Sequence, residues 1–351
     1  MEAAVQKAFP SLKPAFDAPL YIAWEATHRC NARCLHCYSS SGPDKLESEE
    51  MTTEAAKNMI SDLADAGVLV FAFSGGEPLI RKDIYQLIHH AASNGMVVNL
   101  ASNGALINEK SADKLIEAGV RSVTISLDGP DAETHDHFRQ HPGLFRLCIR
   151  AIRILVKKGI RVVVSFTPAR WNYAKGREVV ELAYSLGASA VNMSEYVPAG
   201  RGTREMALPP DLLHEVLLEW IDMRREYEGK MQIIWHDCRA ALLVPPEERD
   251  KYSGCGAGKL TARIMTDGSL TACVFLANPA GNLNETPFRE IWNNSPVLDA
   301  IRNRDLIGGN CLSCSFKSTC GGCRAVSMAY YGNPLMGDPS CWIKKEAVPS
   351  S

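Results

Sequence analysis

The sequence predicts an α/β fold: a partial (β/α)6 barrel followed by a C-terminal cysteine-rich domain. Between residues 20 and 197, short apolar runs alternate with longer amphipathic stretches, as they do in a parallel sheet with right-handed crossovers. Six such strand–helix units are too few for a complete eight-stranded barrel. From about residue 252, Gly, Asn, Pro and Cys become frequent and the expected helices become short. That composition is typical of a domain organised by metal rather than by a large apolar core.

The expected strands are six runs rich in valine, isoleucine and aromatic residues. In chain order they span residues 20–24, 68–74, 96–102, 122–128, 160–167 and 188–197. Expected helices between them include residues 52–67, 82–95 and 108–119, and several begin at Thr, Asn or Asp and end at Gly, as capped helices do. A longer helix over residues 209–229 and a strand-like stretch over 231–235 follow the sixth strand.

These patterns divide the chain into five expected segments. They are an N-terminal extension (1–19), the partial barrel (20–200), a bridging helix and strand (201–250), the cysteine-rich domain (251–345) and a tail (346–351).

Charge and cysteine content narrow the functional classes. A formal net charge of −2 gives no electrostatic reason to expect nucleic acid or a membrane as a partner. No run approaches the roughly 18 apolar residues of a spanning helix, and the first residues do not resemble a signal peptide, so we expect a cytoplasmic location. Because disulfides rarely persist there, the twelve cysteines favour metal binding. Cys148 lies within an apolar run and is the expected core residue among them.

Three cysteines, Cys30, Cys34 and Cys37, follow the first strand with CxxxCxxC spacing. This loop lies at the carboxyl end of the strand, where parallel α/β sheets keep their active sites. A disulfide framework does not use three cysteines evenly, and a Cys₃His zinc site would need His28 or His36 as its fourth ligand. The favoured interpretation is a [4Fe–4S] cluster held by three thiolates, with one iron left open for another ligand.

CxxxCxxC after the first strand, followed by FSGGEP after the second, resembles the radical S-adenosylmethionine (SAM) superfamily. The resemblance covers nearly the whole chain. It implies that the open iron binds the amino and carboxylate groups of SAM. It further implies that reductive cleavage of SAM gives a 5′-deoxyadenosyl radical, which abstracts a substrate hydrogen.

The same resemblance implies a set of SAM-binding residues. They are His36, Gly75, Gly76, Glu77, Ser102, Asn103, Ser126, Asp128 and Arg139. The GGE segment would contact the SAM amino group, with glycines that allow close approach and a carboxylate that offers a negative charge. His36 would pack near the adenine, and the polar strand-end residues would hold the ribose and carboxylate. Arg139 would reach the SAM carboxylate, or else be a solvated helix charge. General acid and base residues are not identified.

Seven cysteines in the C-terminal domain resemble the SPASM extension of radical SAM enzymes, which carries two auxiliary [4Fe–4S] clusters. One departure is that two residues, not three, separate Cys320 from Cys323. The implied outer ligands are Cys311, Cys314, Cys320 and Cys341, and the implied inner ligands are Cys255, Cys273 and Cys323. Cys238 is a candidate fourth inner ligand, and otherwise that position is open to substrate. A zinc knuckle is the alternative, although its central gap is short.

Stretches at the start, after the sixth strand and at the end of the chain look closest to the tetrapyrrole-modifying branch, which includes a heme decarboxylase. Others look like the mycofactocin-maturase branch. The implied reaction is hydrogen abstraction beside a carboxylate, followed by loss of CO₂ and one electron, on a tetrapyrrole propionate or a sugar or nucleoside carboxylate. Peptide maturation is the alternative, and a non-catalytic iron–sulfur electron carrier or sensor is another.

The expected partners are a carboxylate-bearing metabolite or a peptide, and a reductant of the flavodoxin or ferredoxin type. Arg170, Arg201 and Arg204 lie near strand ends and are candidates to pair with substrate carboxylates, or else are solvated loop residues.

Overall fold

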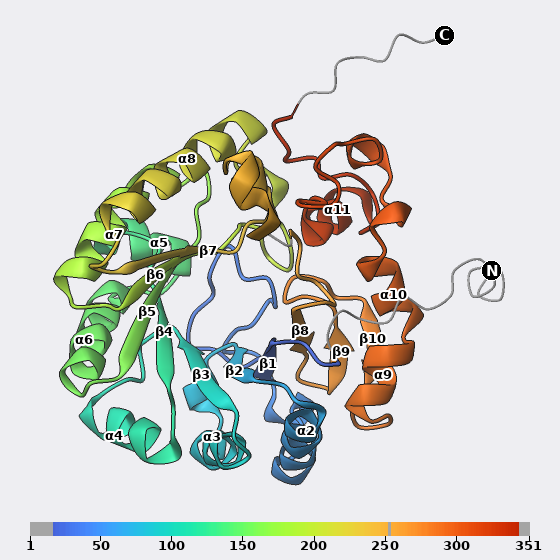
Figure 1. Cartoon of the computed structure of the whole chain (residues 1–351). Helices are drawn as coiled ribbons and strands as arrows, with labels where there is room; N and C mark the ends of the chain where they lie inside the picture. Colours follow the sequence, from blue (N-terminus) through green and yellow to red (C-terminus); the bar gives the residue numbers. More distant parts are fainter. Residues whose placement is uncertain (1–16, 252–253, 344–351) are drawn as a thin grey trace, which may run out of the picture.

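The computed structural model describes residues 17–251 and 254–343 (Figure 1). Within those ranges, ten strands form one sheet in the order β10-β9-β8-β1-β2-β3-β4-β5-β6-β7. The strands are β1 (Tyr21–Thr27), β2 (Val70–Gly75), β3 (Val97–Ser102), β4 (Ser122–Ser126), β5 (Arg161–Phe166), β6 (Ala190–Met193), β7 (Gln232–Trp235), β8 (Thr261–Ile264), β9 (Ser269–Thr271) and β10 (Pro279–Asn282). All neighbours from β8 through β1 to β7 are parallel, while β9 and β10 are antiparallel.

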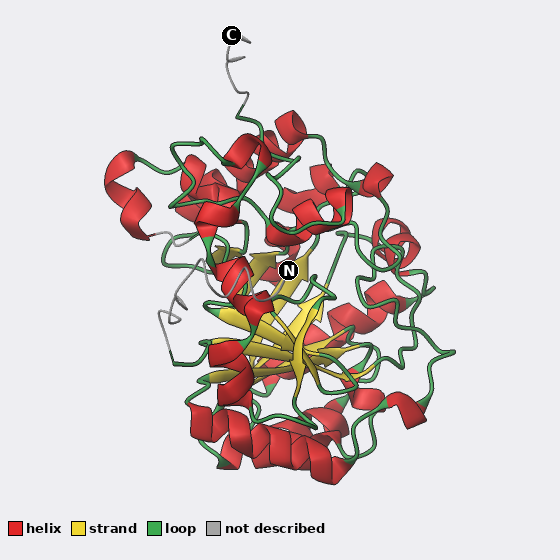
Figure 2. Cartoon of the chain, turned by 90° about the vertical axis from the view of Figure 1, so that its right-hand side faces the viewer, coloured by secondary structure: helices red, strands yellow, loops and turns green. Residues whose placement is uncertain are grey.

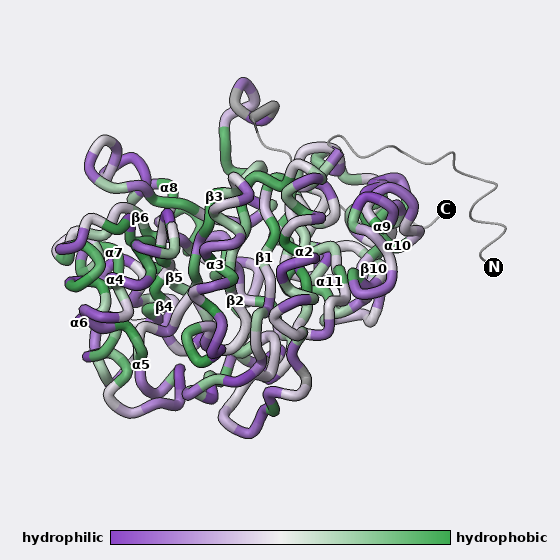
Figure 3. The backbone as a smooth tube through the Cα atoms, turned by 90° about the horizontal axis from the view of Figure 1, so that it is seen from below, coloured by the Kyte–Doolittle hydropathy of each residue, from purple (hydrophilic) through white to green (hydrophobic). Residues whose placement is uncertain are grey.

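Helices cover the outer side of the curved sheet (Figure 1). The α-helices of the described residues are α2 (Thr53–Ala66), α3 (Ile84–Ser93), α4 (Glu109–Ala118), α5 (Ala132–Arg139), α6 (Leu144–Lys157), α7 (Gly176–Ser185), α8 (Pro210–Glu226), α9 (Phe288–Asn294), α10 (Pro296–Arg302) and α11 (Arg324–Tyr331), of which α11 belongs to the C-terminal domain. In α2 the Thr52 side chain accepts a hydrogen bond from the Ala55 amide, and Gly67 ends the helix in the left-handed conformation. Coloured by residue hydropathy, hydrophobic and hydrophilic segments alternate along the helices that surround the sheet (Figure 3).

The core is densest around β1, which is paired on both sides. Its residue Trp24 lies opposite Phe73 of β2 and opposite Ile264 of β8. Trp24 is fully buried and packs against Phe71 and Phe73, with ring centroids 6.2 and 5.7 Å apart. Six of the seven residues of β1 are buried, which shows that both faces of the sheet are covered at this strand.

The partial-barrel prediction is confirmed: all six expected strands form, and the barrel is not closed. Residues 231–235, expected as a bridging strand, contain β7, which extends the parallel sheet beyond β6. At the other edge, β8 to β10 come from the cysteine-rich domain, so the sheet continues across the expected boundary at residue 251. Residues 1–16 of the expected extension and the whole expected tail lie outside the described residues.

The carboxyl ends of the parallel strands face a layer of loops and short helices (Figure 2). The loop that follows β1 runs through the middle of the curve of the sheet (Figure 1). No helix within the described residues has the length and apolar character needed to cross a membrane.

Candidate active site and cluster-binding sites

The three cysteines of the loop after β1 lie together at the carboxyl end of the sheet. Cys30 and Cys34 are buried and Cys37 is half-buried. Burial raises the pKa of Cys30 to about 12, and the nearby thiols of Cys34 and Cys37 add to that effect. Donors already point at two of the sulfurs: Asn103 Nδ2 is 3.7 Å from Cys30 Sγ, and Arg139 Nη1 is 3.7 Å from Cys34 Sγ. Such donors stabilise thiolates, which are the metal-binding form of cysteine.

The surroundings of this loop fit an iron–sulfur cluster better than a zinc ion. His28 is engaged by Glu25, 3.2 Å from its Nε2, and His36 stacks on Phe138 with ring centroids 4.0 Å apart. Among the described residues, no three His, Cys, Asp or Glu side chains are placed to share one metal ion. A set of three soft thiols with no histidine suits iron–sulfur ligation.

Arg201, which follows β6, clamps the cysteine loop. Its Nε donates to the Cys34 carbonyl at 3.0 Å and its Nη1 donates to the Ser41 carbonyl at 2.7 Å. Its backbone amide also donates to the Cys37 carbonyl at 3.0 Å. A Cβ added to the preceding Gly200 would lie 2.4 Å from the Cys37 carbonyl oxygen, so only glycine fits there. The sequence suggested Arg201 as a partner of substrate carboxylates. Its hydrogen bonds to the cysteine loop have no local sequence signal.

The other two candidate arginines are also engaged by the protein itself. Arg204 Nη2 donates to the carbonyls of Ala329 and Tyr330, each at 2.9 Å, near the end of α11. Arg170 Nε donates to the Ala207 carbonyl at 3.1 Å. Substrate carboxylates would therefore compete with these backbone acceptors.

Gly75 and Gly76 bring the end of β2 into direct contact with the start of the cysteine loop. The amide of Gly76 donates to the Thr27 carbonyl at 2.7 Å. A Cβ on Gly75 would lie 2.3 Å from the Thr27 carbonyl oxygen, and one on Gly76 would lie 2.2 Å from that of Arg29. In the structure these glycines make room for the backbone of the loop. Their expected contact with SAM stays a prediction.

Glu77 is fully buried, and protein donors surround its carboxylate. Ser102 Oγ lies 3.0 Å from both carboxylate oxygens, the Asn103 amide donates at 2.8 Å and the Leu79 amide donates at 3.2 Å. Burial raises the pKa of Glu77 to about 7, although these hydrogen bonds oppose the shift. The carboxylate therefore ties the end of β3 to the GGE segment, and in this arrangement it has little capacity left for an ammonium group.

Asp128 and Arg139 form a buried ion pair beside the cysteine loop. Arg139 Nε donates to Asp128 Oδ2 at 2.6 Å, and the Thr167 amide donates to Asp128 Oδ1 at 2.9 Å. Although burial opposes its charge, Asp128 and the Cys34 thiol raise the pKa of Arg139. Ser126 is half-buried at the end of β4, two residues before Asp128. The resemblance predicted these residues as SAM contacts, and the structure places all of them at the carboxyl ends of neighbouring strands or on α5.

The His36 ring is held neutral between Phe138 and Asp128. Its Nε2 is 3.6 Å from Asp128 Oδ2. Burial, together with the guanidinium groups of Arg139 and Arg201, lowers the pKa of His36 well below its ordinary value. Its Nδ1 atom is buried and has no hydrogen-bond partner among the described residues. An unused polar atom at this position is available to a bound ligand.

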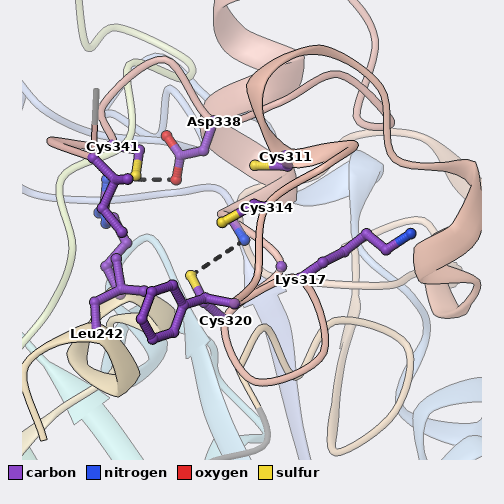
Figure 4. Close-up of a pocket in the computed structure, with 12 residues that line it drawn as sticks. Leu242, Cys311, Cys314, Lys317, Cys320, Asp338 and Cys341 are labelled. Carbon is purple, nitrogen blue, oxygen red and sulfur yellow. Dashed lines mark hydrogen bonds and ion pairs between the residues drawn. The ribbon is translucent and has the colours of Figure 1, made fainter. Parts of the chain in front are cut away.

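In the cysteine-rich domain, the four predicted outer cysteines line one cavity together with Arg239, Lys317 and Asp338. Figure 4 shows Cys311, Cys314, Cys320 and Cys341 around this cavity. The Gly322 amide points at the Cys320 sulfur at a distance of 3.4 Å. Burial, followed by the charges of Asp338, Cys320 and Cys311, raises the pKa of Cys341 to about 11. The four thiols are thus close enough to influence one another, as the ligands of one cluster are.

The predicted inner cysteines lie next to this group. The Cys255 amide donates to the Cys320 carbonyl at 3.2 Å, and the Cys323 amide donates to Asp338 Oδ2 at 2.9 Å. Burial raises the pKa of Cys273 to about 12, and the charge of Cys255 adds to it. Asp338 therefore lies between the two sets of cysteines.

Cys238, the candidate fourth inner ligand, interacts with a cysteine of the outer set. Its hydrogen bond with Cys320 raises the pKa of Cys238 well above the ordinary value and lowers that of Cys320. Cys320 is thus the more acidic thiol of this pair. The charge of Cys323, an inner cysteine, also raises the pKa of Cys238. The structure places Cys238 between the two sets.

A buried charge network that the sequence did not reveal connects the barrel to the cysteine-rich domain. Arg239 is 1% exposed and pairs with Asp237 at 2.7 Å, with Glu195 and with the Ser340 hydroxyl. Asp338 lies 3.6 Å from its Nη1. Burial raises the pKa of Glu195 to about 8, so one carboxyl of this network is readily protonated near neutral pH.

Comparison with known proteins gives consistent matches. A family model described as the Radical SAM superfamily matches residues 24–170, and one described as an iron-sulfur cluster-binding domain, SPASM, matches residues 255–323. AdoMet-dependent heme synthase of Methanosarcina barkeri is 33% identical over 93% of this chain and 97% of its own length. Mycofactocin maturase MftC of Mycobacterium tuberculosis is 32% identical over 97% of this chain and 87% of its own length. Streptococcus suis SuiB bound to S-adenosylmethionine shares the fold, with a TM-score of 0.78 at 19% identity over 93% of this chain and 78% of SuiB.

Proposed function

Since the chain belongs to the radical SAM superfamily and carries its iron–sulfur cluster-binding SPASM domain, we propose that it oxidatively decarboxylates a carboxylate-bearing metabolite, with a tetrapyrrole propionate as the favoured substrate. Its cofactors are a [4Fe–4S] cluster that binds SAM and auxiliary iron–sulfur clusters. The observation that carries the substrate proposal is the match to AdoMet-dependent heme synthase, which spans 93% of this chain and 97% of that protein.

In this proposal Cys30, Cys34 and Cys37 hold the SAM-binding cluster. When bound, that cluster supplies the electron that cleaves SAM to methionine and a 5′-deoxyadenosyl radical. The protein's own residues position the cosubstrate. The backbone of Gly76 and Glu77 lies where the SAM amino group would bind. The Glu77 carboxylate accepts hydrogen bonds from Ser102 and Asn103 and so fixes the end of β3.

The proposed contacts to the rest of SAM use atoms that the protein leaves available. The neutral ring of His36 is suited to pack beside the adenine, and its unused Nδ1 can accept or donate a hydrogen bond. Arg139 is held by Asp128 and retains further N–H donors for the SAM carboxylate. Ser126 and Asn103 lie at neighbouring strand ends, where the ribose would be held.

The proposed substrate step is a hydrogen abstraction followed by loss of CO₂ and one electron. Removal of one hydrogen atom from the carbon β to a propionate carboxyl leaves a carbon radical, which releases CO₂ and one electron and becomes a vinyl group. Acceptance of that electron is the chemistry that an auxiliary cluster supplies when bound. We propose Cys311, Cys314, Cys320 and Cys341 as the outer ligands and Cys255, Cys273 and Cys323 as the inner ligands. We further propose a cytoplasmic location and a flavodoxin or ferredoxin as the reductant.

Anaerobic incubation of the reconstituted enzyme with SAM, dithionite and iron-coproporphyrin III tests the proposal. Mass spectrometry should show loss of CO₂ and two hydrogens from a propionate, with one 5′-deoxyadenosine formed for each loss. 5′-Deoxyadenosine with unchanged porphyrin would contradict the tetrapyrrole assignment. Absence of 5′-deoxyadenosine, from protein with full iron content, would contradict radical catalysis and favour a non-catalytic electron carrier.

Peptide maturation is the second candidate, because mycofactocin maturase MftC is 32% identical over 97% of this chain. It is tested in the same assay by replacing the porphyrin with candidate precursor peptides. A mass change in a peptide that matches the 5′-deoxyadenosine formed, with no change in the porphyrin, would favour this candidate.

A further inference from the structure

Four cationic side chains gather around Cys255 of the inner cysteine set. They are Lys259 before β8, Arg302 at the end of α10, Arg304 just after it, and Arg324 at the start of α11. Their proximity is evident at Lys259. Arg302 Nε donates to the carbonyl of the preceding Gly258 at 2.6 Å, and a Cβ added to Gly254, next to Cys255, would lie 2.8 Å from Arg304 Nη2. Burial lowers the pKa of Lys259, the charges of Arg304, Arg324 and Arg302 lower it further, and Cys255 opposes them. We call these four residues the cationic shell.

The cationic shell contains buried donors that no protein acceptor uses. Arg324 is 2% exposed and Arg302 is 4% exposed. Nη1 of Arg324 and Nη2 of Arg302 are buried and have no hydrogen-bond partner among the described residues. Arg302 has one acidic neighbour, Asp299, at 3.4 Å, and its Nε donates to the Gly258 carbonyl at 2.6 Å. Buried guanidinium groups with unused donors favour an anionic neighbour, which a thiolate-ligated cluster would be.

The two cations of the outer cavity already have carboxylate partners, although Glu195 and Asp338 also add to burial in raising the pKa of Cys323 in the inner set. Arg304 of the cationic shell also acts on Cys320 of the outer set. Asp338 lies in the outer cavity beside Arg239, whose charge is already matched by Asp237. Lys317, the other cation of that cavity, lies 3.4 Å from Asp305. Both cations of the outer cavity therefore have a carboxylate partner, whereas Arg302 and Arg324 of the cationic shell keep unused donors.

A thiolate-ligated [4Fe–4S] cluster is anionic and becomes more negative when it accepts an electron. Nearby positive charge therefore favours the reduced form, and nearby negative charge favours the oxidised form. Such charges act more strongly where the surroundings are dry, as they are around Arg302 and Arg324.

We propose that the cationic shell holds the cluster ligated by Cys255, Cys273 and Cys323 at a more positive reduction potential than the cluster ligated by the outer set. The inner cluster is then the first acceptor of an electron from substrate. The role of the inner cluster as the electron acceptor rests on the proposed function. The charge effect itself requires only that both auxiliary clusters are present.

The test is a spectroscopic redox titration of the full-length reconstituted protein in which Cys30, Cys34 and Cys37 are replaced by alanine. Only the auxiliary clusters then contribute to the signal. We expect two one-electron couples, and Lys259→Gln should move the more positive one to lower potential. The expected change is at least tenfold in the reduction equilibrium, or about 59 mV for one electron. Arg324→Gln should act in the same direction, whereas Arg324→Lys, which keeps the charge, should retain most of the potential.

Lys317→Gln is the matched control, because it removes a lysine charge beside the outer set instead. It should move the more negative couple and leave the more positive one unchanged. The proposal is overturned if Lys259→Gln and Lys317→Gln shift the same couple, or if Lys259→Gln shifts neither. Because this titration uses neither SAM nor substrate, its result is independent of the decarboxylation assay, and either proposal can fail alone.

Discussion

Replacing Arg201 with alanine should release the cysteine loop and selectively weaken binding of the SAM-binding cluster. The substitution removes two hydrogen bonds from a charged donor to backbone carbonyls, at 3.0 Å to Cys34 and at 2.7 Å to Ser41. Hydrogen bonds to charged groups contribute about 1.5–3 kcal/mol each, so the loop loses at least about 3 kcal/mol of stabilisation. Since about 1.4 kcal/mol corresponds to a factor of ten, the arrangement that binds the cluster becomes roughly 100-fold less favoured.

The assay is the rate at which an iron chelator removes iron from the anaerobic protein, followed together with SAM cleavage. Arg204→Ala is the matched control, because Arg204 also donates two hydrogen bonds to backbone carbonyls, but at α11. We expect Arg201→Ala to lose one cluster at least tenfold faster than the native protein and to cleave little SAM, while Arg204→Ala retains both properties. Equal cluster retention and SAM cleavage in the two variants would refute this account of the loop.

Three further predictions follow from the site. Asp128→Asn leaves the charge of Arg139 buried and uncompensated, so it should destabilise the protein by about 3–5 kcal/mol and lower the urea midpoint; an unchanged midpoint would contradict the ion pair. Burial raises the pKa of Glu77 from 4.5 to about 7. The folded protein therefore gains stability from protonated Glu77 below pH 4.5, and it loses about 3 kcal/mol of unfolding free energy as the pH rises from 4.5 through 7. Glu77→Gln should therefore flatten the profile of urea midpoint against pH, and a profile that keeps its slope would assign that slope to another group. Cys34→Ala should abolish SAM cleavage, whereas Cys314→Ala should retain it and lose product formation; full turnover by Cys314→Ala would show that the outer cluster is dispensable.

The main strands of the sheet were predictable because their signals are local. Each of the six runs is rich in apolar and β-branched residues, and residues 231–235 have a similar composition. Strands β8 to β10, which extend the sheet beyond β1, were not predicted. They have only three or four residues each, and β8 is placed by pairing with β1, which no pattern in its own sequence encodes.

The candidate site divides in the same way. The spacing of Cys30, Cys34 and Cys37 and the GGE segment are short motifs that can be recognised within a few residues. Arg201 and the network of Arg239 are different, because each joins groups that are far apart in the chain. Arg201 meets Cys34 across 167 residues, and Arg239 meets Ser340 across 101. Such contacts follow from the assembled fold and cannot be inferred from local pattern.

The pairing of β1 with β8 has a consequence for how the protein is made. Tyr21 lies opposite Thr261, so the first strand emerges from the ribosome 240 residues before its second neighbour, the difference between those two positions. At about 5–20 residues per second, that interval is on the order of 10–50 s. During it, one edge of β1 is unpaired and the cysteine loop that follows lacks its mature surroundings. Insertion of iron is therefore best timed after synthesis of the C-terminal domain, and a nascent chain that stalls before residue 261 would present an open strand edge and free thiols to the cell.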